Sequence, residues 1–509
     1  MTQNDNDTRE KEKGDHVSRH DEPEKRVMDK GLWQLNCGII FMLASSAANG
    51  YNMSLINGLL SLPEFTKNIA HAGDSVIGLI SGGIALGGIC SFIPASYMAD
   101  KFGRKPNVGI GCIIMIIAAI VQTVRPYPWV LFGTRVMLGA GGGLMQSAAP
   151  SLVTEIAHPV HRGALTAMYQ TAWYWGAILS AAVTLGMLHV SNSWSLKVPC
   201  LMQAILPIVQ LFGLCLVPES PRWHIAVGLS EEARATLIKY HANGDEQNEA
   251  VNAQFQGISK AIHGEMSEMS RSSWKSFFKT KGNLRRLTVC ILIGIMTEWA
   301  GNGIISYYLA PILNSVGILS PQHQTAINLG LQVWNTLWAA AGALTCERFG
   351  RRRLWLISTS SMLLCLALAA CLSALFEEHN LHSAGVGVVP MLFLFFAAYD
   401  VAYTPLFIAY PVEIMSLSLR SKGLAVTLFT NAAAAFFNQY VNPIAFGQIG
   451  WRLYLVYLAC LVVWFVMIYI LFPETAGRML EDIDAIFDGE SANPEPSVYS
   501  ESVQNSKVN

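Results

Sequence analysis

The sequence predicts an all-α membrane protein with twelve transmembrane helices arranged in two pseudo-symmetric six-helix bundles. Its 509 residues are 52% hydrophobic and only 14% charged, whereas soluble domains carry about 25% charged residues. About twelve apolar runs are long enough to cross a bilayer, which takes ~20 residues. In addition, one short charged sequence occurs at matching points of the two halves of the chain.

The apolar runs fall into two sets of six. Those of the first half are residues 32–55, 76–98, 107–125, 129–152, 164–187 and 197–217. Those of the second half are residues 286–311, 325–345, 353–375, 387–412, 422–445 and 451–472. Each run predicts one transmembrane helix.

Basic residues are concentrated in alternate loops. The loop after the second run holds Lys101, Arg104 and Lys105, and the loop after the eighth holds four arginines, at positions 348 and 351–353. The alternate loops hold at most one basic residue each. Because loops rich in Lys and Arg stay on the cytoplasmic side, we expect these two loops and both chain ends to be cytoplasmic.

The remaining segments define the expected domain organisation. Residues 1–30 and 476–509 are polar and low in aromatic residues, which predicts disordered cytoplasmic tails. Residues 31–220 and 286–475 would form the two bundles. Residues 221–285 are the sizeable soluble segment, in which Ser230 and the two following glutamates resemble a helix start. We expect several short amphipathic helices there, which join the bundles on the cytoplasmic face.

Matched charges are the strongest functional signal. The hairpin Asp100-Lys101-Phe102-Gly103-Arg104-Lys105 returns as Glu347-Arg348-Phe349-Gly350-Arg351-Arg352. A second pattern repeats too, because Glu155 precedes Arg162 at the same spacing as Glu413 precedes Arg420. Arginine bonds carboxylates through a planar fork and stays charged. We expect gating networks, formed in one conformation and broken in another, that contain Asp100, Arg104, Glu155, Arg162, Glu347, Arg351, Glu413 and Arg420. Static anchors that keep basic loops inside are the alternative.

The two halves end in related motifs, Pro218-Glu219-Ser220-Pro221-Arg222-Trp223 and Pro473-Glu474-Thr475. With the repeated hairpins, they resemble the motifs of the sugar porters of the major facilitator superfamily, over nearly the whole chain. Within that family the chain is most similar to fungal lactose-permease-like sugar transporters, through Trp299-Ala300-Gly301-Asn302-Gly303, Ser306-Tyr307-Tyr308, Tyr403-Thr404-Pro405 and Asn438-Gln439-Tyr440-Val441-Asn442-Pro443. The resemblance implies the major facilitator fold, a plasma-membrane location and alternating access around a site between the halves.

Polar side chains inside the apolar runs mark candidate substrate contacts, because such groups are costly in lipid and usually face the bundle interior. Amides and carboxylates suit sugar hydroxyls, and aromatic rings suit the apolar face of a sugar. The candidates are Gln170, Glu298, Trp299, Asn302, Tyr307, Tyr308, Asp400, Asn431 and Asn438. In the resembled family the positions of Gln170, Glu298 and Asn431 contact sugar. Hydrogen bonding between helices without a ligand is the alternative for each residue.

Two positions depart from the resembled family. Glu298 stands where that family usually has Gln, and a carboxylate there could bond hydroxyls, exchange a proton or attract a cationic group. Asn52 stands where proton-coupled porters commonly have Asp, beside an arginine equivalent to Arg135. Because Asn cannot titrate, this position cannot carry a proton. We therefore favour facilitated diffusion, with Glu298 or Asp400 as alternative coupling groups.

The leading hypothesis is a sugar carrier for a hexose or a disaccharide such as lactose or cellobiose. The alternatives are a proton-coupled sugar symporter and a carrier or exporter of a non-sugar fungal metabolite or organic acid. The tail after Pro473 is short for a nutrient receptor that signals, so we do not favour a receptor. The sequence has no phosphate-binding glycine loop followed by Lys and Ser or Thr, so we expect neither an ATP-driven pump nor an enzyme. The expected partners are a small molecule, the bilayer and, for a symporter, protons. We expect no cofactor, metal or nucleic acid.

Overall fold

A computed structural model describes residues 30–69, 73–125, 127–190, 192–271, 274–416 and 419–476, together with residues 483, 486 and 487. The predicted tails therefore lie almost entirely outside the described residues. Within the described ranges every regular element is an α-helix or a short 3-10 helix, which confirms the all-α class.

The first half forms four long helices and two helices that are each interrupted once. The long helices are α5 (Asp74–Phe102), α6 (Arg104–Val124), α7 (Pro128–Ile156) and α8 (Pro159–Met187). The interrupted helices are α2 (Lys30–Met42) with α3 (Ala44–Leu60), and α9 (Trp194–Met202) with α10 (Ile205–Leu216). The short α4 (Pro63–Asn68) follows α3.

The second half has one interrupted helix and five continuous ones. The interrupted helix is α14 (Lys281–Met296) with α15 (Asn302–Ser315). The continuous helices are α16 (Pro321–Phe349), α17 (Arg351–His379), α18 (His382–Ile414), α19 (Arg420–Ile449) and α20 (Leu453–Leu471). Each predicted apolar run overlaps one of these helices or one interrupted pair. By length and composition, seven helical segments of the described residues could cross a membrane.

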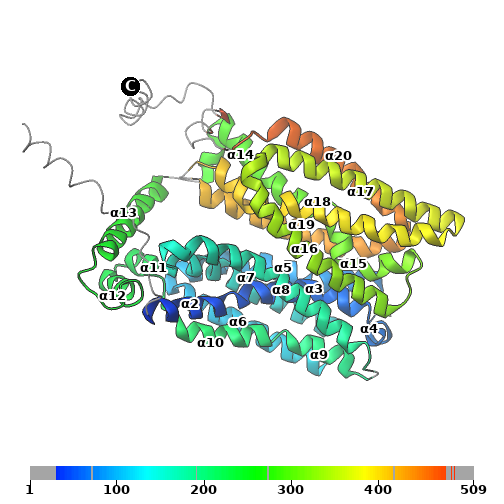
Figure 1. The fold of residues 1–509 in the computed structure, drawn as a ribbon, viewed down its shortest axis with the longest axis horizontal. Coiled ribbons are helices and arrows are strands. Elements are labelled where there is room, and N and C mark those ends of the chain that lie inside the picture. Colours follow the sequence, from blue (N-terminus) through cyan, green and yellow to red (C-terminus); the bar gives the residue numbers. More distant parts are fainter. Residues whose placement is uncertain are drawn as a thin grey trace, which may run out of the picture.

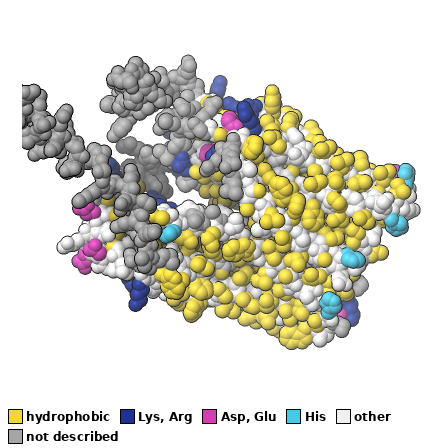
Figure 2. All heavy atoms as spheres, viewed as in Figure 1, with side chains coloured by type: hydrophobic (Ala, Val, Ile, Leu, Met, Phe, Trp, Pro, Cys, Tyr) yellow, Lys and Arg dark blue, Asp and Glu magenta, His cyan; other side chains and the backbone are white. Residues whose placement is uncertain are grey.

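The buried apolar side chains divide between the halves. One cluster contains buried residues between Phe277 and Phe487, and two further clusters contain buried residues between Leu35 and Tyr240. Figure 1 shows the two halves side by side, with the blue-to-teal helices packed against the yellow and orange ones. Figure 2 shows hydrophobic side chains over the flank of both halves and charged ones at the ends. Exposed apolar surface of this extent suits contact with lipid.

Residues 221–285 hold α11 (Pro221–Ala226), α12 (Ser230–His241), α13 (Glu249–Arg271) and the 3-10 helix η2 (Trp274–Phe278). Helix α13, with 23 residues, is longer than the short helices expected. Ser230 is the first residue of α12, which confirms the predicted helix start, and Leu229 occupies the cap position. Helices α11–α13 lie at one end of the molecule, here called the linker end, and α4 lies at the other, the α4 end (Figure 1).

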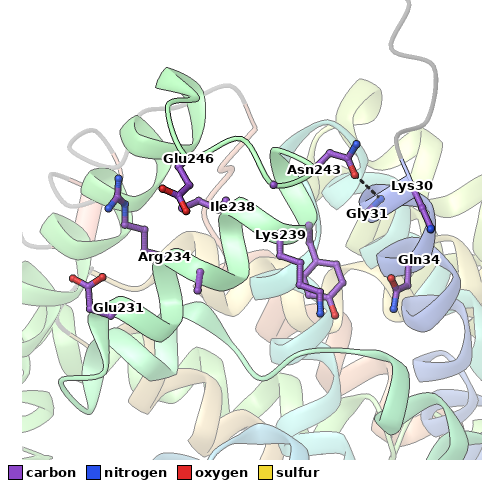
Figure 3. Close-up of a pocket in the computed structure, with 12 residues that line it drawn as sticks. Lys30, Gly31, Gln34, Glu231, Arg234, Ile238, Lys239, Asn243 and Glu246 are labelled. Carbon is purple, nitrogen blue, oxygen red and sulfur yellow. Dashed lines mark hydrogen bonds between the residues drawn. The ribbon is translucent and has the colours of Figure 1, made fainter.

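A surface pocket of about 700 Å³ lies at the linker end, between the start of α2 and α12. The backbone N–H of Gly31 donates to Oδ1 of Asn243 at 3.3 Å beside it (Figure 3). Its lining residues, all within the described chain, include none of the predicted substrate contacts. The pocket is therefore separate from the predicted substrate site.

Candidate substrate site and charged networks

Glu298 lies in the break between α14 and α15, where Gly301 adopts a left-handed conformation with φ of 102°. Its Oε1 accepts a hydrogen bond from Nδ2 of Asn431 on α19 at 3.3 Å, and the same amide group donates to Oγ1 of Thr297 at 3.0 Å. Among the described residues, Oε2 of Glu298 has no hydrogen-bond partner. Two predicted contacts thus lie together at the helix break.

Asn438 fixes the backbone at the same break. Its Nδ2 donates to the backbone oxygen of Glu298 at 2.7 Å and to the hydroxyl of Tyr457 at 3.1 Å. Its Oδ1 accepts from Nδ2 of Asn442 at 2.5 Å. Since these bonds use both the NH₂ group and the oxygen of a buried amide, Asn438 holds the backbone of Glu298 in place. Direct contact of Asn438 with substrate stays a prediction.

The aromatic candidates divide into two groups. Trp299 donates from Nε1 to the backbone oxygen of Ala434 at 3.3 Å and stacks on Phe437, with ring centroids 5.2 Å apart. Tyr308 is buried and donates to the backbone oxygen of Gln439 at 2.6 Å. Each of these two bonds is made to a backbone oxygen of the second half. Tyr307, in contrast, is half-buried against an apolar cluster of the first half.

Asn302 is the remaining candidate on α15. Its side chain is buried, and its Oδ1 has no hydrogen-bond partner among the described residues. A buried carbonyl oxygen without a partner is unfavourable unless water or a ligand satisfies it. Asn302 is thus placed near the helix break with an unused acceptor.

Asp400 on α18 connects the two halves. Its Oδ1 accepts from the hydroxyl of Tyr174 on α8 at 3.0 Å and from Oγ1 of Thr404 at 2.9 Å, while Oδ2 has no partner among the described residues. Gln170 has an exposed side chain one turn before Tyr174, and residues four apart share a helix face. Gln170 therefore lies on the same side of α8 as Tyr174.

The predicted coupling pair has an unexpected arrangement. Oδ1 of Asn52 accepts from Nε2 of Gln203 at 2.7 Å, whereas Nη1 of Arg135 donates to the backbone oxygen of Asn52 at 3.4 Å. Arg135 is 1% exposed, and its Nε and Nη2 have no partner among the described residues. The side chain of Asn52 thus pairs with Gln203, and Arg135 meets only the backbone of Asn52 here.

The charged residues at the linker end form one network in the first half. Nε of Arg104 lies 3.4 Å from Oε2 of Glu155, and Ser220 bonds the same carboxylate. The carboxylate of Glu219 accepts from the backbone N–H groups of Arg104 at 3.1 Å and Lys105 at 3.0 Å. This network ties the start of α6 to the ends of α7 and α10.

The second half repeats the network with equivalent residues. Nη2 of Arg351 lies 3.1 Å from Oε1 of Glu413, and Oγ1 of Thr475 donates to Oε2 of Glu413 at 2.5 Å. Oε1 of Glu474 accepts from the backbone N–H of Arg351 at 2.7 Å. Each ion pair therefore joins helices of one half.

The other predicted gating residues do not complete these pairs. Asp100 and Arg162 are exposed. Arg420 is half-buried, with Nε lacking a partner among the described residues. The side chain of Glu347 lies outside the described part of the structure. Of the eight predicted residues, the described structure thus pairs Arg104 with Glu155 and Arg351 with Glu413, and gating by the whole set stays a prediction.

Several residues of these sites escaped the sequence analysis. Gln203 and Tyr174 lie inside apolar runs, so the search for polar groups within spans could have found both. Glu219 and Glu474 belong to the end-of-half motifs, and their repetition was the available signal. Among the described residues, no group of three or more His, Cys, Asp or Glu could hold a metal ion.

A family model described as "Sugar (and other) transporter" matches residues 37–487. The MFS-type transporter criB of Aspergillus cristatus is 27% identical over 89% of this chain and 93% of its own length. The MFS-type transporter oryC of Aspergillus oryzae is 30% identical over 84% of this chain and 78% of its own. The hexose transporter HXT9 of Saccharomyces cerevisiae is 26% identical over 86% and 80%, respectively.

Among solved structures, the inward open conformation of the xylose transporter XylE from E. coli superimposes with a TM-score of 0.72. The match covers 88% of this chain and 99% of the XylE chain, and the two sequences are 19% identical. The shared fold and the family match confirm the resemblance carried by the repeated motifs.

Proposed function

Because the chain belongs to the family of sugar (and other) transporters, we propose that it carries a sugar across the plasma membrane by alternating access. The family is one of transporters rather than enzymes. Relatives named as hexose and glucose transporters support a hexose as substrate. The lactose-permease-like motifs of α15 and α19 make a disaccharide such as lactose or cellobiose the second choice.

In this proposal the helices cross the bilayer twelve times. Helices α7, α8 and α16 each have 29 residues, which is about 43 Å at 1.5 Å per residue and enough to span. Residues 31–220 and 286–475 form the two bundles, and residues 221–285 join them. The basic loops beside Arg104 and Arg351 support a cytoplasmic location for the linker end and both termini.

The hydrogen bond between Glu298 and Asn431 carries the proposal. It lies at a break in a helix, and transporters of this kind build their substrate sites where helices are discontinuous. Oε2 of Glu298 and Oδ2 of Asp400, which have no partner in the described parts of the chain, are acceptors for sugar hydroxyls. Binding would bring Gln170 of the first half towards Glu298 and Asn431 of the second.

The pairing of Asn52 with Gln203 supports facilitated diffusion. Neither amide can titrate, and Arg135 has no carboxylate partner among the described residues that could take up a coupled proton. In this proposal the solute therefore moves down its own gradient. Proton symport through Glu298 or Asp400 is the alternative that the same experiment tests.

A second candidate function is transport of a non-sugar metabolite. It is favoured by the carboxylates of Glu298 and Asp400, each of which has one oxygen without a partner among the residues that the structure describes. Two acidic groups of this kind would attract a solute that carries a protonated amine. Such a carrier would not take up neutral sugars.

The test is uptake of labelled glucose, galactose, lactose and cellobiose by yeast without its own sugar carriers, with and without a protonophore. We expect uptake of at least one sugar to equilibrium, unaffected by the protonophore. Accumulation that the protonophore abolishes would replace facilitated diffusion by symport. Lack of uptake by protein verified at the cell surface would favour the non-sugar carrier.

A further inference from the structure

The side chain of Asn57 bonds two backbone groups of a bent helix in the other half of the molecule. Asn57 lies on α3 and is 2% exposed. The backbone N–H of Leu309 on α15 donates to its Oδ1 at 2.9 Å, and its Nδ2 donates to the backbone oxygen of Ile305 at 3.4 Å. In an unbroken α-helix the N–H of Leu309 would donate to the oxygen of Ile305 itself. One amide thus replaces one missing helical bond.

The break has a local cause. Tyr308 has non-helical angles, with φ of −136° and ψ of 32°. Pro311 follows three residues later and lacks an N–H, and its ring clashes with the carbonyl of Tyr307, four residues before it. The groups freed by such a break are costly in apolar surroundings unless a neighbour satisfies them. Insertion of a side chain into the helical ladder is an established cause of sharp bends.

The same amide reaches a third partner in the second half. Nδ2 of Asn57 also lies 3.3 Å from Oδ1 of Asn328 on α16, which accepts from Gln332 as well. At this α4 end the halves approach closely elsewhere, since a Cβ atom on Gly78 would lie 2.5 Å from the backbone oxygen of Tyr440. Asn57 therefore belongs to the contact that closes the two halves here.

We propose that Asn57 is a positioning residue that couples the bend of α15 to closure of the α4 end. This inference rests on the proposed alternating access. When the halves separate at the α4 end, the amide must leave α15, and Leu309 and Ile305 regain their helical bond or take up water. The bent α15 then belongs to the closed state and a straighter α15 to the open state. A side chain at this position must carry both a donor and an acceptor to bond the oxygen of Ile305 and the N–H of Leu309 together.

The experiment measures distances between spin labels on cysteines introduced at Lys67 of α4 and Gln322 of α16, after the native exposed cysteines are replaced. Both positions are exposed and lie at the α4 end on opposite halves. We expect Asn57→Leu to lower the ratio of short to long distances about tenfold, because buried groups on α15 lose their partners. Asn57→Asp, which keeps the acceptor and loses the donor, should give a smaller decrease.

Asn107→Leu is the matched control. Asn107 is also buried, but its Nδ2 donates to Ala95 and Ser147 of its own half, so its removal should leave the distance ratio unchanged. An unchanged ratio in both Asn57 variants would overturn the proposal, and Asn57→Asp keeps the test open if the leucine variant does not fold. The readout needs no substrate, so a missing sugar uptake with a shifted ratio would refute the proposed function alone.

Discussion

At the scale of single residues, Glu298 and Asp400 share one arrangement. Each carboxylate spends one oxygen on protein donors and keeps the other without a partner among the described residues. Removing one partner of a buried polar contact costs more than the contact contributes, because the remaining group stays unsatisfied. In the proposed function, a substrate that donates to both of these oxygens would gain affinity at each carboxylate, and substitutions can test this.

Replacing Glu298 by Gln separates a sugar from a cationic substrate. The amide oxygen of Gln can still accept from Asn431, so sugar uptake should change by less than about tenfold, whereas Glu298→Ala should lower it by about tenfold or more. Concentration-dependent uptake of the sugar measures both effects. The exposed Glu378→Gln is the control and should match the unmodified protein. Equal loss in Glu298→Gln and Glu298→Ala would instead show that the negative charge is required.

Asn52→Asp should introduce proton coupling. The new carboxylate can still accept from Gln203 and would lie beside the buried guanidinium of Arg135. Unlike the amide of Asn52, this carboxylate can bind and release a proton. Uptake should become stimulated by an acidic exterior and sensitive to a protonophore. Asn49→Asp adds the same charge one turn earlier on α3 and should leave uptake insensitive. Protonophore-insensitive uptake in Asn52→Asp would show that this position does not control coupling.

The sequence was sufficient to find these polar residues but not their partners. The cost of polar groups in lipid singled out Asn52, Arg135 and Asp400. That Asn52 bonds Gln203, far away in the chain, depends on how α3 faces the break between α9 and α10. Packing between helices decides which side chains meet, and local sequence patterns do not show how two helices pack.

At the scale of elements, Gly103 and Gly350 form equivalent turns in the two halves. Gly103 has φ of 98° and Gly350 has φ of 81°. A Cβ atom would lie 2.6 Å from Oε2 of Glu219 at the first turn and 2.8 Å from Oε2 of Glu474 at the second. Each carboxylate is held by backbone N–H groups of the following helix. Glycine is thus required twice over, by conformation and by space.

Gly103→Ala and Gly350→Ala should each destabilise the protein by about 1–3 kcal/mol, since both place a side chain at positive φ. The midpoint of thermal unfolding in detergent should fall in both variants. Gly133→Ala is the control, because Gly133 is helical, an added Cβ atom there would enter open space, and alanine favours the helix. A fall in Gly133→Ala equal to that in the turn variants would contradict the argument.

The positions of the helices were largely predictable, and their interruptions were not. Apolar runs of the observed lengths require helices in lipid, so each predicted run overlaps an element. The break between α14 and α15 was missed because hydropathy continues through Thr297 and Trp299. It depends on Gly301 and on Asn438, whose amide holds the backbone of Glu298.

At the scale of the whole molecule, the two networks at the linker end and the contacts between halves have different tasks. The pairs of Arg104 with Glu155 and of Arg351 with Glu413 each join helices of one half. The bonds of Tyr174 with Asp400 and of Asn57 with Leu309 join the halves. Halves that are tied internally and joined to each other by separable contacts are what a rocking motion around a central site requires.

The most direct test of the account is exchange of labelled sugar across liposomes that contain only the purified protein. With unlabelled sugar inside and no ion gradient, we predict transient accumulation of label, which is unchanged when a proton gradient of either sign is imposed. The Glu298→Ala variant should lose most of this exchange. Absence of exchange for every sugar, or exchange that depends on the proton gradient, would contradict a facilitated sugar carrier built around Glu298 and Asn431.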